Sequence, residues 1–171
     1  MTKPAFSQVF GLALTLLLDV SVTGCRHSGN PTPVVVTHVE SPDHRYQALW
    51  ETTPFNSHRV VARDLSDGSR ETILEFDRWV NMYWSPEGDK IALNYSSASN
   101  EMELVVLRRE NTRWLRQEVH PSELSEHCEY HHTSIRFKKW LDNRTVLLDL
   151  SGCKDASDYV SIQELKFICL D

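Results

Sequence analysis

The stretch YWSPEGDKIALNY, from Tyr83 to Tyr95, predicts a strand, a tight corner and a second strand. Both arms are rich in aromatic and aliphatic residues, and Ser85, Pro86, an acidic residue and Gly88 form the corner between them. Proline suits the second position of a type I turn, and a residue with positive φ often closes such a corner. The stretch therefore predicts an antiparallel strand pair.

Two further corners follow the same plan. The sequence SPDH at 41–44 precedes RYQALW, and LDN at 141–143 precedes RTVLLDL. His44 and Asn143 tolerate positive φ, as Gly88 does, so we expect the three corners to share one backbone conformation. The first two corners are about 44 residues apart and the next spacing is about 56, which returns to the low forties once residues 120–132 are treated as an insertion.

A period in the low forties, with four strands in each unit, is typical of propeller blades. We expect an all-β domain at 34–171, built from four-stranded antiparallel units at about 34–76, 79–119 and 133–171. Outer hairpins are predicted at Asp67-Gly68 and at Asn111. In the second unit the predicted strands are 79–84, 89–95, 102–109 and 112–119. A compact β-sandwich built from the same hairpins is the alternative.

The second unit resembles the WD40-like repeat of the periplasmic propeller of the Tol system and of the propeller domains of prolyl oligopeptidases. The core pattern of that repeat, W/F-S-P-D-G-x-x-I-A-F, is matched from Trp84 to Leu93, more weakly in the first unit and most weakly in the third. The resemblance implies β-propeller blades but no particular activity. Because closed propellers need at least four blades, three units imply an open or partial propeller, whose edges should be capped or bound.

The N-terminus predicts a lipoprotein signal peptide at residues 1–24. Its apolar run, Val9 to Leu18, is about half the ~20 residues that a membrane-spanning helix needs. The sequence VTGC, ending at Cys25, resembles the lipobox of bacterial lipoproteins, in which the cysteine becomes the lipidated first residue. The resemblance implies diacylglyceryl and N-acyl chains, such as palmitate, on Cys25. An ordinary secretory signal with an incidental cysteine is the alternative.

The segment 25–33 is then the lipidated cysteine and a polar tether rich in Pro and Gly. Arg26 follows the cysteine where Asp would favour the inner membrane, so we expect an outer-membrane anchor facing the periplasm. The formal charge of −6 is unchanged when residues 1–24 are removed, because Lys3 and Asp19 leave together. An acidic domain argues against nucleic acid as a partner.

Three cysteines follow the tether. A hairpin over 134–150 would bring Cys128 and Cys153 to the same end, so we expect these two to form a disulfide in an exported protein. Cys169 alternates with apolar residues and is predicted to be buried in a strand.

A histidine-rich segment surrounds Cys128. His127, His131 and His132 are candidate ligands for zinc or copper, although a disulfide at Cys128 would remove the thiolate. A periplasmic metal-binding lipoprotein using residues 127–132 is therefore the alternative function, and no other cofactor is expected.

No catalytic motif is found: the sequence lacks a Gly-x-Ser-x-Gly elbow, a Walker loop and a His-Glu-x-x-His motif. Trp84 and Trp140 occupy equivalent positions and should fill the core between units. Trp114 lies in a charged run and is expected to be exposed as a partner contact. The sequence thus predicts an envelope-anchored lipoprotein that is a non-catalytic protein-interaction module, with an envelope protein as its partner.

Overall fold

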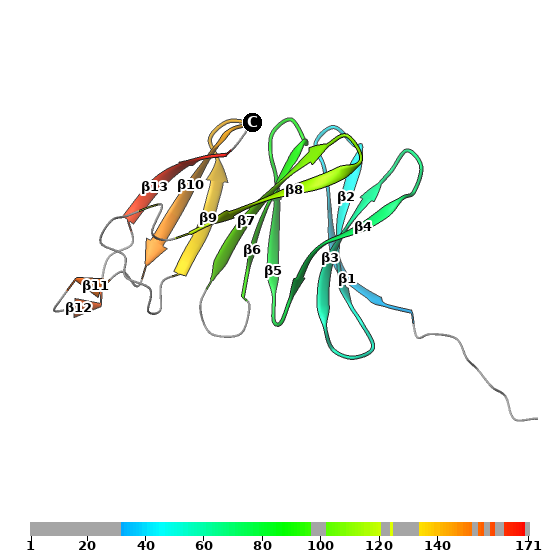
Figure 1. The fold of residues 1–171 in the computed structure, drawn as a ribbon, viewed down its shortest axis with the longest axis horizontal. Helices are drawn as coiled ribbons and strands as arrows, with labels where there is room; N and C mark the ends of the chain where they lie inside the picture. Colours follow the sequence, from blue (N-terminus) through cyan, green and yellow to red (C-terminus); the bar gives the residue numbers. More distant parts are fainter. Residues whose placement is uncertain are drawn as a thin grey trace, which may run out of the picture. The chain divides into compact units, whose positions relative to one another are not determined.

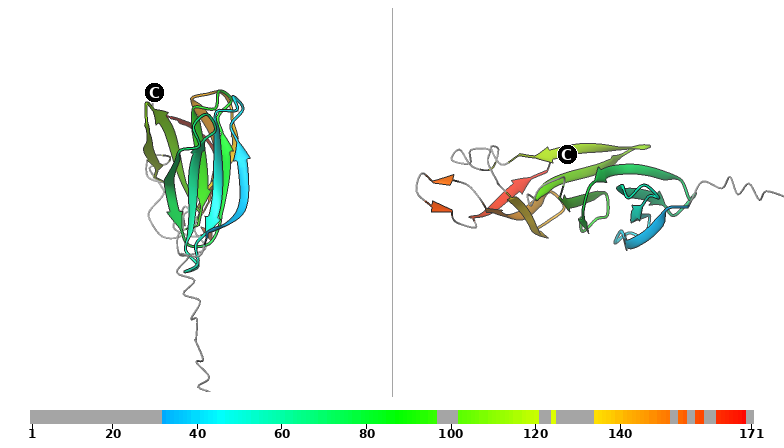
Figure 2. Two further views of the ribbon diagram at one scale, coloured as in Figure 1. Left: turned by 90° about the vertical axis from the view of Figure 1, so that its right-hand side faces the viewer. Right: turned by 90° about the horizontal axis from the view of Figure 1, so that it is seen from below.

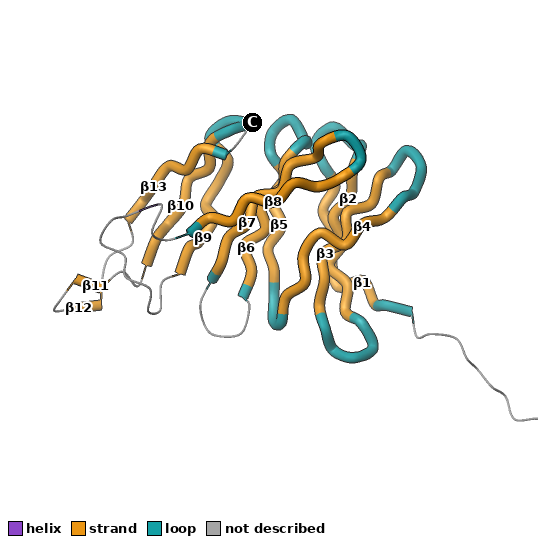
Figure 3. The backbone as a smooth tube through the Cα atoms, viewed as in Figure 1, coloured by secondary structure: helices purple, strands orange, loops and turns teal. Residues whose placement is uncertain are grey.

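The computed structural model describes residues 32–96, 102–120, 124, 134–151, 154–155, 158–159 and 163–169. The described elements are strands joined by turns and loops (Figure 3). Within these ranges no helix is long and apolar enough to cross a membrane. The predicted all-β fold class is confirmed.

The strands form three open antiparallel sheets (Figure 1). The first sheet contains, in order, β1 (Val34–Glu40), β2 (Tyr46–Thr52), β3 (His58–Asp64) and β4 (Arg70–Phe76). The second contains β5 (Val80–Trp84), β6 (Lys90–Tyr95), β7 (Glu103–Glu110) and β8 (Arg113–Val119). The third, in the order β13-β10-β9, contains β9 (Ser134–Trp140), β10 (Thr145–Ser151) and β13 (Gln163–Ile168).

The strands of the second sheet lie within one residue of the predicted bounds at each end. Both predicted outer hairpins are present, with positive φ at Gly68 (75°) and Asn111 (53°). The prediction of four strands in the third unit is wrong, because this sheet has three among the described residues. The chain between β10 and β13 contains β11 (Lys154–Asp155) and β12 (Asp158–Tyr159), which pair only with each other and add no strand to the sheet.

The first two corners share one hydrogen-bond pattern. The Oγ of Ser41 accepts the N–H of Tyr46 at 2.9 Å, and the Oγ of Ser85 accepts the N–H of Lys90 at 3.1 Å. His44 and Gly88 close the corners with φ of 57° and 78°, as predicted. The serine hydroxyl thus satisfies the first N–H of the following strand in both sheets.

The third corner is built differently, and the predicted positive φ at Asn143 is wrong. Leu141 bonds to Thr145, four residues on, whereas Ser41 bonds to Tyr46, five residues on. In this shorter corner Oδ1 of Asp142 accepts the N–H groups of Arg144 and Thr145, both at 2.7 Å. The carboxylate of Asp142 therefore takes the place of a residue with positive φ in this corner. The side chain of Asn143 extends instead to the corner of the second sheet.

The second sheet packs against both of its neighbours (Figure 2). Side chains alternate along a strand, so Ile91 and Leu93 face the first sheet while Ala92 faces the third. Every residue of β6 is consequently buried. This arrangement of three sheets differs from the compact β-sandwich considered as the alternative.

Equivalent tryptophans join the sheets, as predicted. The indole N–H of Trp84 donates to the carbonyl of Val39 in the first sheet at 3.2 Å. The indole N–H of Trp140 donates in the same way to the carbonyl of Tyr83 in the second sheet at 3.0 Å. Each ring also packs on a core cluster between two sheets, so both tryptophans fill the core and cap the preceding edge strand.

The buried side-chain amide of Asn94 provides hydrogen-bond partners for two backbone groups of the edge strand β9. Asn94, 1 % exposed, donates to the carbonyl of Ile135 at 2.8 Å and accepts the N–H of Phe137 at 3.1 Å. The N–H of Ile135 donates to the carbonyl of Met102 at 2.8 Å. The backbone of an edge strand that faces protein instead of water must find such partners.

The outer face of the first sheet contains a buried ion cluster. Glu51 is 2 % exposed and lies on the face opposite Trp50, which packs into the core. Its carboxylate pairs with Arg59 at 2.9 Å and with Arg70. This buried carboxylate is therefore compensated by two guanidinium groups of neighbouring strands.

The substitution Asn94→Ala should destabilise the fold strongly. It leaves two buried backbone groups of β9 without partners, so we expect a loss of about 3 kcal/mol in the free energy of unfolding. Asn81 is exposed and lies opposite Asn94 in the β5–β6 pair, so Asn81→Ala should cost less than about 0.5 kcal/mol. Urea unfolding of both variants measures the difference, and equal losses would contradict the role given to Asn94.

Candidate functional site

The corners of the three sheets meet at one end of the domain (Figure 1). A β-carbon at Gly88 would lie 2.7 Å from Oδ1 of Asp43, so the second corner fits directly against the first. The side chain of Asn143 donates to Glu87 and to Asp89, both at 3.0 Å, which joins the third corner to the second. We refer to residues 41–45, 85–89 and 141–144 as the corner row.

The carboxylates of the corner row are held by hydrogen bonds within the row. Oδ1 of Asp43 accepts the hydroxyl of Ser41 at 2.6 Å. Partial burial acts to raise the pKa of Asp89, but hydrogen bonds from Asn143 and Lys90 outweigh it, so the net pKa lies below its usual value. These acidic side chains therefore have a structural role at neutral pH.

Beside the corner row, two hollows of about 260 and 310 Å3 open between the first and second sheets. Tyr46 and Arg109 line both of them. The larger is bordered by Asp43, Glu87 and Asp89 of the corner row, and the smaller by Glu71 and Trp114. We refer to these two hollows, which share Tyr46 and Arg109, as the corner cleft.

Arg109 is the central group of the corner cleft. Its guanidinium lies 5.8 Å from the ring centre of Tyr46 and 5.6 Å from that of Trp114, within the range of cation–π attraction. Its Nη1 pairs with Glu71 of β4 at 3.1 Å, across the gap between sheets. Its Nε is buried and has no hydrogen-bond partner in the described part of the chain. The guanidinium is therefore fixed in place by Glu71 and by the two rings.

The position of Tyr46 follows from the first corner. Its N–H donates to Ser41, which starts β2 at this residue and directs the ring toward the second sheet. The ring stacks on Trp84 at 6.3 Å and meets the edge of Trp114 at 5.6 Å. Arg45 covers it at 5.4 Å. One aromatic cluster thus forms both the core between two sheets and the wall of the corner cleft.

Trp114 is not an exposed contact residue, and that expectation is wrong. It is 9 % exposed and belongs to the core between the first and second sheets. Its face of β8 also carries Arg116 and Glu118, and the ring is buried because its end of that face packs against the first sheet. Trp114 enters the corner cleft only as part of its wall.

Most other predicted site residues lie outside the described residues: Cys25, His127, Cys128, His131, His132 and Cys153. Their roles stay predictions from the sequence, as does metal binding by residues 127–132. Where the structure is described, it contains no group of three or more His, Cys, Asp or Glu that could hold a metal ion. Cys169 is buried, as expected, but it lies directly after β13 and not within the strand. Its thiol is free, and burial raises its pKa to about 11.

Sequence reasoning missed the pairing of Tyr46 with Arg109, because these residues come from different sheets. One signal was present: each serine-containing corner is followed after five residues by the first residue of the core strand, Tyr46 or Lys90. A large aromatic ring at that point must lie near the neighbouring unit. Which arginine of the second unit meets it depends on strand register, which the sequence pattern does not determine.

The substitution Gly88→Ala should cost more than Gly68→Ala. Both glycines have similar positive φ, of 78° and 75°, so each pays the left-handed cost of about 1–2 kcal/mol. Only at Gly88 would the new β-carbon meet the side chain of Asp43. Urea unfolding should show an excess loss for Gly88→Ala, which Asp43→Ala in the same chain relieves. Equal losses at the two glycines would show that the corners do not pack tightly.

The substitution Asn143→Ala should have a pH-dependent effect. The lowered pKa of Asp89 means that its carboxylate stabilises the fold above its usual value of 3.8 and that this contribution is lost as the pH falls through the folded-state pKa. At pH 7 we expect Asn143→Ala to cost about 1–2 kcal/mol. Urea unfolding near pH 2.5 should show a smaller cost, whereas Asn81→Ala should show no such change.

No protein-family model matches this sequence, and no curated protein matches it. The functional proposal therefore rests on the sequence motifs and on the geometry of the corner cleft.

Proposed function

We propose that this chain is an envelope-anchored lipoprotein whose β domain is a non-catalytic protein-interaction module, with the corner cleft as its partner-binding site. The lipid anchor is Cys25, in the lipobox-like sequence at 22–25. The proposed location is the outer membrane facing the periplasm, because Arg26 follows the cysteine. The proposed partner is an envelope protein that offers a polypeptide segment to the cleft.

One observation carries the binding proposal: Tyr46, Arg109 and Trp114 converge on one cleft between rigid sheets. Tyrosine, tryptophan and arginine are the residue types enriched in the hot spots of protein interfaces. Here the arginine is already held by Glu71 and by two rings, so little side-chain freedom would be lost on binding. A polypeptide segment could accept a hydrogen bond from the partly exposed guanidinium, with the buried rings of Tyr46 and Trp114 as the floor beneath it.

The same proposal includes an open, propeller-like arrangement of the three sheets. It is supported by the repeated bond from Trp84 to Val39 and from Trp140 to Tyr83, which relates each sheet to the next by the same contact. It is also supported by the matching serine bonds of the first two corners. An open form leaves the cleft between the first and second sheets accessible at the corner end.

The substitution Arg109→Gln should weaken partner binding at least tenfold, because it removes the charge from the centre of the corner cleft. Affinity-tagged full chain would be used to recover proteins from envelope extracts, with mass spectrometry to identify and quantify them. The matched control is Arg136→Gln, which removes an exposed arginine from β9 in the third sheet. Circular dichroism of both variants checks that the fold is intact.

Recovery of one envelope protein by the unchanged chain and by Arg136→Gln, but not by Arg109→Gln, is the expected result. Equal recovery by all three chains would exclude the corner cleft as the binding site. Recovery of no specific protein would count against the interaction function itself.

A further inference from the structure

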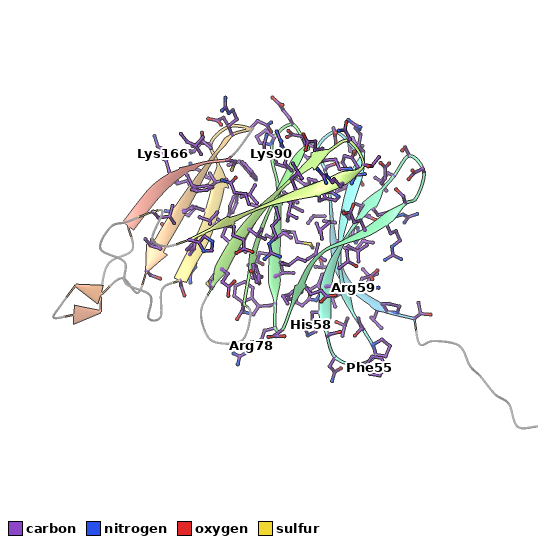
Figure 4. All side chains as sticks on the ribbon, in the orientation of Figure 1. Phe55, His58, Arg59, Arg78, Lys90 and Lys166 are labelled. Atoms are coloured by element: carbon purple, nitrogen blue, oxygen red, sulfur yellow. The ribbon has the colours of Figure 1, made fainter. Side chains whose placement is uncertain are left out.

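A second surface lies at the opposite end of the domain, in the turn between β2 and β3. Phe55, at the tip of this turn, is 91 % exposed (Figure 4). Beside it, at the start of β1, Val34 and Val36 are 68 % and 51 % exposed. Val34 pairs with Thr52, the last residue before the turn, so these side chains belong to one surface. We refer to Val34–Val36 and residues 53–57 as the tether-end tip.

The turn that presents Phe55 is well ordered by its own hydrogen bonds. The N–H of Thr53 donates to the carbonyl of Ser57 at 2.8 Å, and the N–H of Asn56 donates to the carbonyl of Thr53 at 3.0 Å. The two hydroxyls of Thr53 and Ser57 also bond to each other at 2.6 Å. Asn56 closes the turn with a φ of 59°, a conformation that asparagine tolerates. The exposure of the ring is therefore built into the turn.

An aromatic base supports the turn from the inner face of the first sheet. His58, directly after the turn, stacks on Phe76 at 5.6 Å and meets the edge of Trp50 at 5.9 Å. Its Nδ1 also bonds to the hydroxyl of Thr52 at 3.0 Å. Both ends of the turn are thus fixed to the core, so Phe55 is held away from it.

The tether-end tip combines exposed apolar side chains with the absence of any charged residue. The sequence TTPFNSH at 52–58 contains no Asp, Glu, Lys or Arg, in a chain with a formal charge of −6. Proteins rarely place a large apolar ring and neighbouring valines together in water unless that surface has a contact. An uncharged apolar tip suits a lipid surface of any headgroup charge, whereas the acidic remainder of the domain does not attract an anionic one.

The length of the tether places this end of the domain near a membrane anchor. Val34 follows Cys25 by nine residues, which span at most about 30 Å when fully extended. Phe55 lies three residues beyond the partner of Val34, so it belongs to the part of the domain closest along the fold to the anchor.

We propose that the tether-end tip contacts the lipid surface, with the ring of Phe55 entering the boundary between headgroups and acyl chains. This contact orients the domain so that the corner cleft, at the other end, faces away from the bilayer. The proposal rests on the proposed lipid anchor at Cys25. Lipid chains then supply attachment, and the tip supplies orientation.

Quenching by brominated lipid tests the contact. Full-length lipidated chains carrying Phe55→Trp or Leu141→Trp would be reconstituted into vesicles of phosphatidylcholine and phosphatidylethanolamine, with and without brominated phosphatidylcholine. Leu141 is the matched control, because it is a 41 % exposed apolar residue in the corner row. After subtraction of the parent emission, brominated lipid should lower the added emission at position 55 at least twofold and leave that at position 141 unchanged. Equal quenching at both positions, or none at either, would overturn the proposal.

A second experiment tests the lipid contact independently of the proposed anchor at Cys25. If the full-length chain does not float with vesicles, the proposal of a lipid anchor is wrong. The contact is then measured on a Cys25→Ser chain that carries a hexahistidine after Arg26 and is bound to vesicles through nickel-chelating lipid. Quenching at position 55 in that arrangement supports the contact, and its absence overturns it. If Phe55→Ser abolishes recovery of the envelope protein and Phe55→Trp is not quenched, the tip binds protein and the lipid proposal is wrong.

Discussion

The packing of the three sheets depends on a hydrogen bond that is made twice, from an indole N–H to the carbonyl of the preceding edge strand. Where an edge strand touches the next sheet, a backbone carbonyl at the contact loses water as a partner, so the adjoining sheet must provide a donor. Trp84 provides it for β1 and Trp140 for β5, each from the residue directly before a corner. Both tryptophans directly precede the corner of their own sheet, so each bond brings that corner against the corner of the preceding sheet. The corner row results from this repeated spacing, and the corner cleft opens beside it.

The positions of the strands could be predicted because they depend on local signals. Alternating apolar residues, Pro and Gly at corners, and Asp67-Gly68 define strands and turns over a few residues, and the structure follows them. The third corner shows where this reasoning fails: Asn143 can adopt positive φ, but one residue fewer in the corner and the carboxylate of Asp142 make this unnecessary. The residue type of Asn143 indicated that positive φ was allowed, and the shorter corner determined that it was not adopted.

The candidate site was less predictable, since it depends on contacts between sheets. Trp114 was expected to be exposed because its neighbours in sequence are charged, yet packing of the first sheet against this part of β8 buries the ring. The meeting of Tyr46 with Arg109 requires two sheets to be placed side by side, which no single segment encodes. The same holds for Asn94, whose amide looks like an ordinary polar residue of a strand until β9 is placed against it.

The corner cleft and the tether-end tip give the two ends of the domain different chemistry. One end presents fixed charge and aromatic rings, and the other an uncharged apolar turn. Such a division suits a protein that must hold one end toward an anchor while the other end remains available to a partner.

The ion cluster on the outer face of the first sheet has a consequence for self-association. Repeated units that stack on one another carry a risk of open-ended polymerisation, because the free face at one end can accept the first unit of another molecule. Here that face contains Glu51 with Arg59 and Arg70. A second molecule stacked on it would have to desolvate the partly exposed guanidinium groups of Arg59 and Arg70 without supplying a new partner for them. The ion cluster therefore makes further stacking on this face unfavourable.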